Sequence, residues 1–203
     1  MKKFSRLPLC ILLCSLLVGP SWAYPVKYAE QYYKLYHTQL YQYPENYEEN
    51  IWYLERALKS DFVNPLYALA RPINDSASWA KYRALFRMHV NLKLIEQYRG
   101  LARKFDREQT FFFNAPWKEE NLESLEIAEH FYRTALYYWP EAMAWAERAS
   151  NQPYLHYEGI EDWEDERYRI MNEDLDYGEI IRMDLEHLAR VRREFEAMDD
   201  STY

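Results

Sequence analysis

Apolar residues recur at intervals of three and four along nearly the whole chain after residue 24. The first such segment places Tyr28, Tyr32, Tyr36 and Leu40 about one helical turn apart. This spacing puts side chains on one face of an α-helix, whereas a strand alternates every two residues. The chain also has only 4 glycines among 203 residues, too few to supply the many tight turns of a β-sandwich or barrel. The pattern therefore predicts an all-α fold.

The periodic segments and the breaks between them predict the order of the helices. Ser76 or Ser78 is expected to cap a long helix, Gly100 to weaken it or end it early, and Pro140 to start a new helix. Pro65 suits the first turn of a short helix. The other expected helices cover residues 25–43, 45–59, 76–104, 121–139, 140–149, 160–171 and 179–198.

The first 23 residues have the pattern of a secretory signal peptide. A basic start is followed by an apolar run over residues 7–18, and the small residues Ser21 and Ala23 stand at positions −3 and −1 of a cleavage point after Ala23. The apolar run is shorter than the roughly 20 residues that a membrane-spanning helix needs. We therefore expect a signal peptide over 1–23, a single all-helical domain over 24–203, and a periplasmic or otherwise exported protein.

Removal of residues 1–23 changes the charge and the chemistry of the chain. It deletes three basic residues and no acid, so the formal net charge of −8 becomes −11. It also deletes both cysteines, Cys10 and Cys14, although a lipid anchor on one of them remains an alternative to cleavage. An acidic surface repels nucleic acid and anionic lipid. We therefore expect no nucleic-acid binding and no membrane insertion after cleavage.

The stretch from Ala128 to Pro140 has the residue pattern of a helical repeat. Ala128, Tyr132, Ala135 and Pro140 have the spacing found in the second helix of a tetratricopeptide repeat and at its end. The small residues let a partner helix approach, the aromatic residue fills the groove, and the proline stops the helix. The first-helix half of the repeat is missing, since Pro116 interrupts it. A tetratricopeptide-like array of antiparallel helical hairpins and an irregular helical bundle both remain open.

Residue patterns that indicate catalysis or metal binding are weak. The sequence has no Gly-rich phosphate loop, no Gly-x-Ser-x-Gly elbow and no His-Glu-x-x-His pair. Glu126 and His130 lie one turn apart, but nothing nearby completes a zinc site. Asp174, Asp176 and Gly178 are out of phase with a calcium-binding loop. We therefore expect a protein that is not an enzyme, with no catalytic residue, no cofactor and no metal.

The acidic segment 161–166 leaves a second function open. Glycosidases use two carboxylates in a cleft, and Trp163 and Tyr157 are placed to line one. This alternative is an envelope hydrolase or a cell-wall sugar-binding protein that uses the region around Trp163. The simpler explanation is a solvated helix face in an acidic protein.

Closely spaced aromatic residues suggest a surface for a protein partner. The chain has 20 Tyr, 9 Phe and 7 Trp, and neighbouring helix positions point about 100° apart, so consecutive aromatic residues do not all fit one buried face. Tyr and Trp are enriched where proteins bind one another. We expect part of this set to bind a protein partner in the cell envelope, with core packing as the alternative. The candidate partner-binding residues are Phe111, Phe112, Phe113, Trp117, Tyr137, Tyr138 and Trp139.

Five segments resemble a group of small exported tetratricopeptide-type proteins of spirochaetes. They are ENIWYLERALK at 49–59, NPLYALA at 64–70, NAPW at 114–117, AEHFYRTALYYWP at 128–140 and LDYGEII at 175–181. The resemblance covers most of the mature chain and implies a periplasmic scaffold for protein–protein interactions. Some proteins of this group belong to the periplasmic flagellar collar, so the resemblance implies motor or collar proteins as partners and a role in motility. It implies no catalytic residue.

Overall fold

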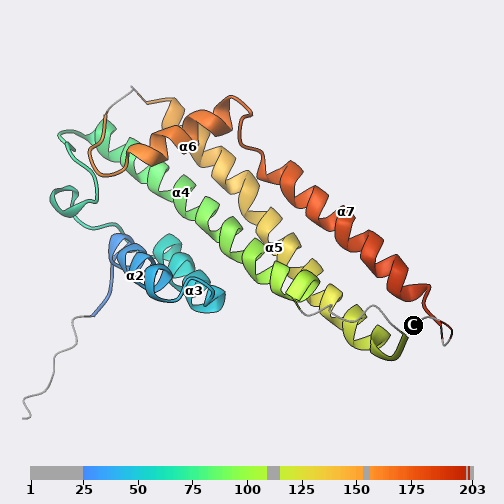
Figure 1. The fold of residues 1–203 in the computed structure, drawn as a ribbon. Helices are drawn as coiled ribbons and strands as arrows, with labels where there is room; N and C mark the ends of the chain where they lie inside the picture. Colours follow the sequence, from blue (N-terminus) through green and yellow to red (C-terminus); the bar gives the residue numbers. More distant parts are fainter. Residues whose placement is uncertain (1–24, 109–114, 153–155, 200, 202–203) are drawn as a thin grey trace, which may run out of the picture.

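The computed structural model describes residues 25–108, 115–152, 156–199 and 201, and it confirms the all-α prediction. Six α-helices pack with antiparallel contacts (Figure 1). The described residues form no strand, only two isolated bridges, Tyr28 with Asp61 and Arg71 with Glu158. The predicted signal peptide lies outside the described residues.

The elements follow one another in an order close to the prediction. They are α2 (Ala29–Gln42), α3 (Tyr47–Lys59), the 3-10 turn η1 (Pro65–Tyr67), α4 (Ser76–Arg103), the π-helical turn η2 (Lys104–Glu108), the 3-10 turn η3 (Ala115–Trp117), α5 (Lys118–Ser150), α6 (Glu161–Met171) and α7 (Tyr177–Glu196).

A long antiparallel hairpin of α4 and α5 forms the centre of the molecule. Figure 1 shows α7 running along α5, the short α2–α3 pair lying against α4, and α6 crossing one end of the hairpin. The two central helices have 28 and 33 residues. Since a tetratricopeptide repeat fits two helices into about 34 residues, this hairpin is too long to be one repeat. Of the two architectures that the sequence left open, the described residues form the irregular bundle.

The buried face of α5, which packs against α4 and α7, explains why the sequence resembles a repeat. On α5, alanine occupies every seventh position, and each of these alanines is fully buried: Ala128, Ala135, Ala142 and Ala149. Leu125, Tyr132, Trp139 and Ala146 form a second buried row with the same period. A seven-residue period is the pattern of two helices packed along a common seam. The repeat-like spacing at 128–135 is therefore one part of a longer seam.

The prediction that Pro140 separates two helices was wrong. Proline in a helix interior removes one hydrogen bond and costs about 3 kcal/mol, yet α5 continues through Pro140 without a break. Pro140 is exposed, while Trp139 and Ala142 on either side of it are buried. Packing of both halves of α5 against its neighbours therefore outweighs the local cost.

Two predictions about α4 also need correction. Its cap is Asp75, whose Oδ1 accepts a hydrogen bond from the Ser78 amide at 2.7 Å, and not Ser76 or Ser78. The helix also continues past Gly100. A Cβ atom at this position would lie 2.4 Å from the Tyr47 ring, so the glycine lets Tyr47 of α3 pack closely instead of ending the helix.

Candidate functional site

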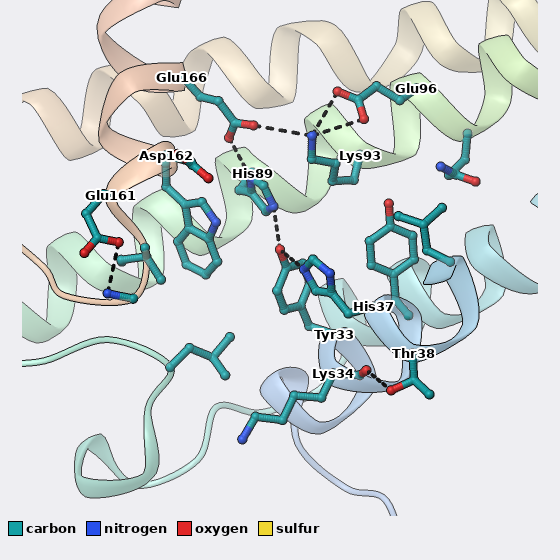
Figure 2. Close-up of a pocket in the computed structure, with 17 residues that line it drawn as sticks. Tyr33, Lys34, His37, Thr38, His89, Lys93, Glu96, Glu161, Asp162 and Glu166 are labelled. Carbon is teal, nitrogen blue, oxygen red and sulfur yellow. Dashed lines mark hydrogen bonds and ion pairs between the residues drawn. The ribbon is translucent and has the colours of Figure 1, made fainter. Parts of the chain in front are cut away.

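A cavity of about 930 Å³ lies where α2, α4 and α6 meet (Figure 2). On α4, His89, Lys93 and Glu96 follow one another at about one helical turn, so they form one stripe that faces the cavity. The residues that line it include Tyr33, Tyr36 and His37 of α2, His89, Lys93 and Glu96 of α4, and Trp163 and Glu166 of α6.

Hydrogen bonds connect these helices through what we call the polar chain, formed by His37, Tyr33, His89, Glu166, Lys93 and Glu96. The Tyr33 hydroxyl lies 2.7 Å from His37 Nε2 and 2.6 Å from His89 Nε2. His89 Nδ1 lies 2.5 Å from Glu166 Oε2. A neutral His89 that donates from Nδ1 to Glu166 accepts from Tyr33 at Nε2, and Tyr33 then accepts from His37. Every member is satisfied in this arrangement, as buried polar groups require.

Lys93 continues the polar chain on α4. Its Nζ donates to both carboxylate oxygens of Glu96, at 3.0 and 3.1 Å, and lies 3.5 Å from Glu166 Oε1. Burial alone would lower the pKa of Lys93, but Glu96 and Glu166 outweigh it and raise that pKa. Lys93 is therefore charged at neutral pH and neutralises part of the acidic wall.

Tyr33 does not have the properties of an activated hydroxyl. The residue is 5% exposed, and burial, with contributions from Tyr36 and Glu166, raises its pKa far above the usual value. A hydroxyl with a raised pKa is a poor nucleophile and a poor proton donor to substrate. Although Tyr33, His89 and Glu166 follow the order of a hydroxyl, base and orienting carboxylate, their contacts are those of a structural bridge.

The acidic segment on α6 is divided between solvent and interior. Glu161 and Asp162 are exposed at the cavity edge. Glu164 is buried and pairs with Lys81 at 2.5 Å and with Arg167 at 2.6 Å. The segment is therefore not simply a solvated helix face, because Glu164 and Glu166 make ion pairs inside the fold.

The two aromatic residues predicted to line a sugar cleft are both buried. Trp163 is 4% exposed and lies against four rings, stacking on His89 with centroids 4.8 Å apart. Tyr157 is 1% exposed, and its hydroxyl donates to the Ser78 carbonyl at 2.9 Å. Trp163 lines the cavity, but one face of its indole is covered by His89.

A second site lies on the opposite flank of α4, between α3 and α5. We call it the aromatic groove and define it by Leu58, Arg87, Tyr137, Tyr138, Glu141 and Trp145, which line a volume of about 400 Å³. Tyr137 is 70% exposed. Tyr138 stacks on Tyr98 at 5.7 Å and donates to Glu55 at 3.3 Å. One tyrosine is thus fixed in the wall while the other is open to solvent.

Of the predicted partner-binding residues that the structure describes, it brings together Tyr137 and Tyr138. Trp139 is 7% exposed and packs against Tyr177, with ring centroids 6.0 Å apart. Trp117 is half-exposed but lies at the N-terminal end of α5, 20 residues from Tyr137 and about 30 Å along the helix axis. The predictions for Phe111, Phe112 and Phe113 fall outside the described residues.

Sequence reasoning missed Trp145, Arg87 and Leu58 as parts of the groove. Tyr137, Glu141 and Trp145 follow one another at intervals of four on α5, so they share one helix face. This four-residue spacing is visible in the sequence. It indicates a shared face only if one helix continues through Pro140, and the sequence pattern predicts a break there.

Neither a metal cluster nor a membrane span was found in the described part of the chain. Among those residues, no three His, Cys, Asp or Glu side chains are placed to hold a metal ion together. None of the described helices combines the length and the apolar composition that crossing a membrane requires.

Residues 77–198 match a protein family described as a domain of unknown function (DUF8513). The matched range covers α4, α5, α6 and α7 and leaves out α2 and α3. It therefore includes Tyr137 and Trp145 but not the α3 wall of the groove. No curated protein and no solved structure matches the chain significantly.

Proposed function

Because the chain belongs to the DUF8513 family, whose function is unknown, we propose a function from its own surface: it is an exported, non-enzymatic adaptor that binds a protein partner in the aromatic groove. The observation that carries the proposal is Tyr137, which is 70% exposed beside Tyr138 and Trp145 in a groove between helices. Tyr, Trp and Arg dominate binding energy at protein interfaces, especially within pockets.

The shape and charge of the groove favour an amphipathic helix as its occupant. Its walls are the helices α3 and α5, and its aromatic side chains repeat along α5 at one-turn intervals, which suits the apolar stripe of a partner helix. Arg87 lines the groove and forms no ion pair among the described residues. Glu55, Lys59 and Glu141 also line the groove, and Lys59 pairs with Glu55. We therefore assign the groove to a helix whose apolar stripe is flanked by an acidic side chain that pairs with Arg87 and by a basic side chain that pairs with Glu141.

The setting of this adaptor follows from the sequence. The signal-peptide pattern at 1–23 supports export to the periplasm. The resemblance to small exported tetratricopeptide-type proteins of spirochaetes supports a partner in the periplasmic flagellar collar or motor, and hence a role in motility. The buried, fully bonded Tyr33 supports a binding role over a catalytic one.

Affinity purification from cells tests the adaptor function. The bait carries Tyr137→Ala together with Trp145→Ala, and the matched control carries Tyr41→Ala, which removes a 91% exposed tyrosine from α2. We expect the wild-type and Tyr41→Ala baits to recover the same envelope or motor protein, and the double variant to recover at least tenfold less. Equal recovery by the double variant, with its folding unchanged by circular dichroism, would remove the groove from the proposal.

The cavity supports a second candidate, binding or cleavage of cell-wall sugars. Its volume of about 930 Å³ is within the range of small-molecule pockets. The Tyr36 hydroxyl is buried there without a hydrogen-bond partner of good geometry, its polar neighbour being Gln97. A buried hydroxyl of this kind gains from a ligand that bonds to it.

Incubation of the purified protein with cell-wall fragments tests this candidate. Binding measured by calorimetry, or release of soluble sugar, should weaken at least tenfold in Tyr36→Phe, while Tyr41→Phe should behave as wild type. If the wild-type protein neither binds nor cleaves the fragments, the cell-wall sugar candidate is ruled out.

A further inference from the structure

A small hollow of about 280 Å³ lies beside the aromatic groove on the α4–α5 hairpin. Three arginines surround it, Arg83 and Arg87 from α4 and Arg148 from α5, together with Trp145 and Gln152. Two alanines also line it, and the described residues of its lining include no Asp or Glu. A cluster of one charge sign is unusual in a chain with a formal net charge of −8.

Aromatic rings, and not carboxylates, hold these guanidinium groups in place. The guanidinium carbons of Arg87 and Arg148 lie 4.6 and 4.2 Å from the centre of the Trp145 ring. Arg83 lies 5.6 Å from the centre of the Trp79 ring. Within the described parts of the chain, none of the three arginines forms an ion pair.

The arrangement leaves positive charge without compensation. Arg83 and Arg87 lie at i and i+4 on one helix, where like charges repel. Arg87 is partly buried, and burial, followed by the charges of Arg83 and Arg148, lowers its pKa. Guanidinium stays charged at neutral pH, so the repulsion persists until an anion enters the hollow.

We propose that this hollow binds a tetrahedral oxyanion, phosphate or sulfate. Guanidinium groups bind such anions through paired N–H donors, and three of them exceed the charge of one dianion. The Gln152 amide is a further donor in the lining, and Ala80 and Ala84 contribute only small side chains to it. The proposal is independent of the adaptor function, although the hollow shares Arg87 and Trp145 with the aromatic groove.

Isothermal titration calorimetry at low ionic strength and pH 7 tests the proposal, with inorganic phosphate, sulfate and acetate as probes. The variant Arg148→Gln removes an exposed guanidinium from the hollow. Its matched control, Arg133→Gln, removes an exposed guanidinium of the same helix that already pairs with Glu129 at 2.7 Å. We expect saturable binding of phosphate and sulfate, at least tenfold weaker binding of acetate, and a loss of at least tenfold in affinity for phosphate in Arg148→Gln alone.

NMR places the anion and separates it from partner binding. Phosphate should shift the indole N–H resonance of Trp145 in the wild type and in Tyr137→Ala, because Tyr137 does not line the hollow. A titration with O-phosphoserine in place of phosphate shows whether the site also accepts a phosphate group on a larger molecule. Absence of saturable phosphate and sulfate binding, or equal weakening in Arg133→Gln and Arg148→Gln, would overturn the proposal.

Discussion

The two flanks of α4 use the same kinds of side chain in opposite ways. Toward α2 and α6, the polar chain combines aromatic rings with His89, Lys93 and Glu166, and each charged group has a partner. Toward α3 and α5, the aromatic groove combines Trp145 with Arg87, which has rings around it but no carboxylate partner among the described residues. Paired groups stabilise a fold, whereas unpaired groups at a surface are available to a ligand.

The aromatic side chains of the two flanks also differ in their exposure to solvent. Trp163 in the cavity wall is 4% exposed, whereas Tyr137 over the groove is 70% exposed. Burial of a large aromatic side chain contributes several kcal/mol to folding, while an exposed one contributes to stability only weakly. Substitutions on the first flank should therefore affect stability, and substitutions on the second should affect binding.

The largest effect is expected for Trp163→Ala. Removal of a ring that contacts Tyr33, Tyr82, Phe86 and His89 leaves a large hole and should cost about 3 to 5 kcal/mol of unfolding free energy. Urea unfolding, monitored by circular dichroism, measures this loss of unfolding free energy. The control Trp52→Ala, at a ring 48% exposed, should cost much less, and equal losses at the two positions would contradict the comparison.

The next effect is expected for Glu164→Gln, which leaves Lys81 without its carboxylate at a site where Lys81 is 1% exposed. Breaking a buried ion pair costs about 3 to 5 kcal/mol. The control is Glu179→Gln, because Glu179 pairs with Arg182 on the exposed surface of α7, where such pairs contribute less than about 1 kcal/mol. A loss below 1 kcal/mol in Glu164→Gln would show that this pair is solvated.

On the groove side, Tyr137→Ala should leave the unfolding free energy within about 0.5 kcal/mol of wild type. The same substitution should lower affinity for a purified partner about tenfold, since exposed aromatic residues over grooves are typical hot spots. Paired unfolding and binding measurements separate the two effects. A large loss of stability with unchanged affinity would place Tyr137 in the fold and not in the interface.

The smallest effect concerns pH and His37. Burial, followed by the charges of His89 and Lys93, lowers the pKa of His37 from its usual value near 6.5. Its contribution to stability is therefore fully present above about pH 6.5 and is lost as the pH falls through the lower, folded-state pKa. Unfolding curves between pH 7.5 and 5 should show a shallower decline in His37→Gln than in wild type; identical slopes would exclude this contribution.

The sequence predicts features that depend on residues within one segment better than features that depend on contacts between distant segments. The helices were predictable because spacings of three and four report burial within each segment. The break predicted at Pro140 rests on a local rule, whereas packing of α5 against α4 and α7 on both sides of the proline holds the helix together. The seven-residue period of alanines that reveals the seam runs across the proline.

The two sites were harder to predict than the helices. Tyr33 and His89 are 56 positions apart, and His89 and Glu166 are 77 apart, so no local pattern connects them. The sequence predicted one wall of the aromatic groove, because Tyr137 and Tyr138 are adjacent, but it did not predict the other wall, which comes from α3. Trp139 shows the limit of counting aromatic residues, since it packs inward while Tyr137, two positions earlier, is exposed.

Site-specific photo-crosslinking in living cells tests the central claim, that the aromatic groove is the partner surface. p-Benzoylphenylalanine is placed at position 137 in the groove or at position 41 on α2, both of which are well exposed tyrosines. We expect a single crosslinked envelope protein at position 137, lost when Trp145→Ala is added, and none at position 41. The same crosslinked protein at both positions, or crosslinking at position 137 that is insensitive to Trp145→Ala, would contradict it.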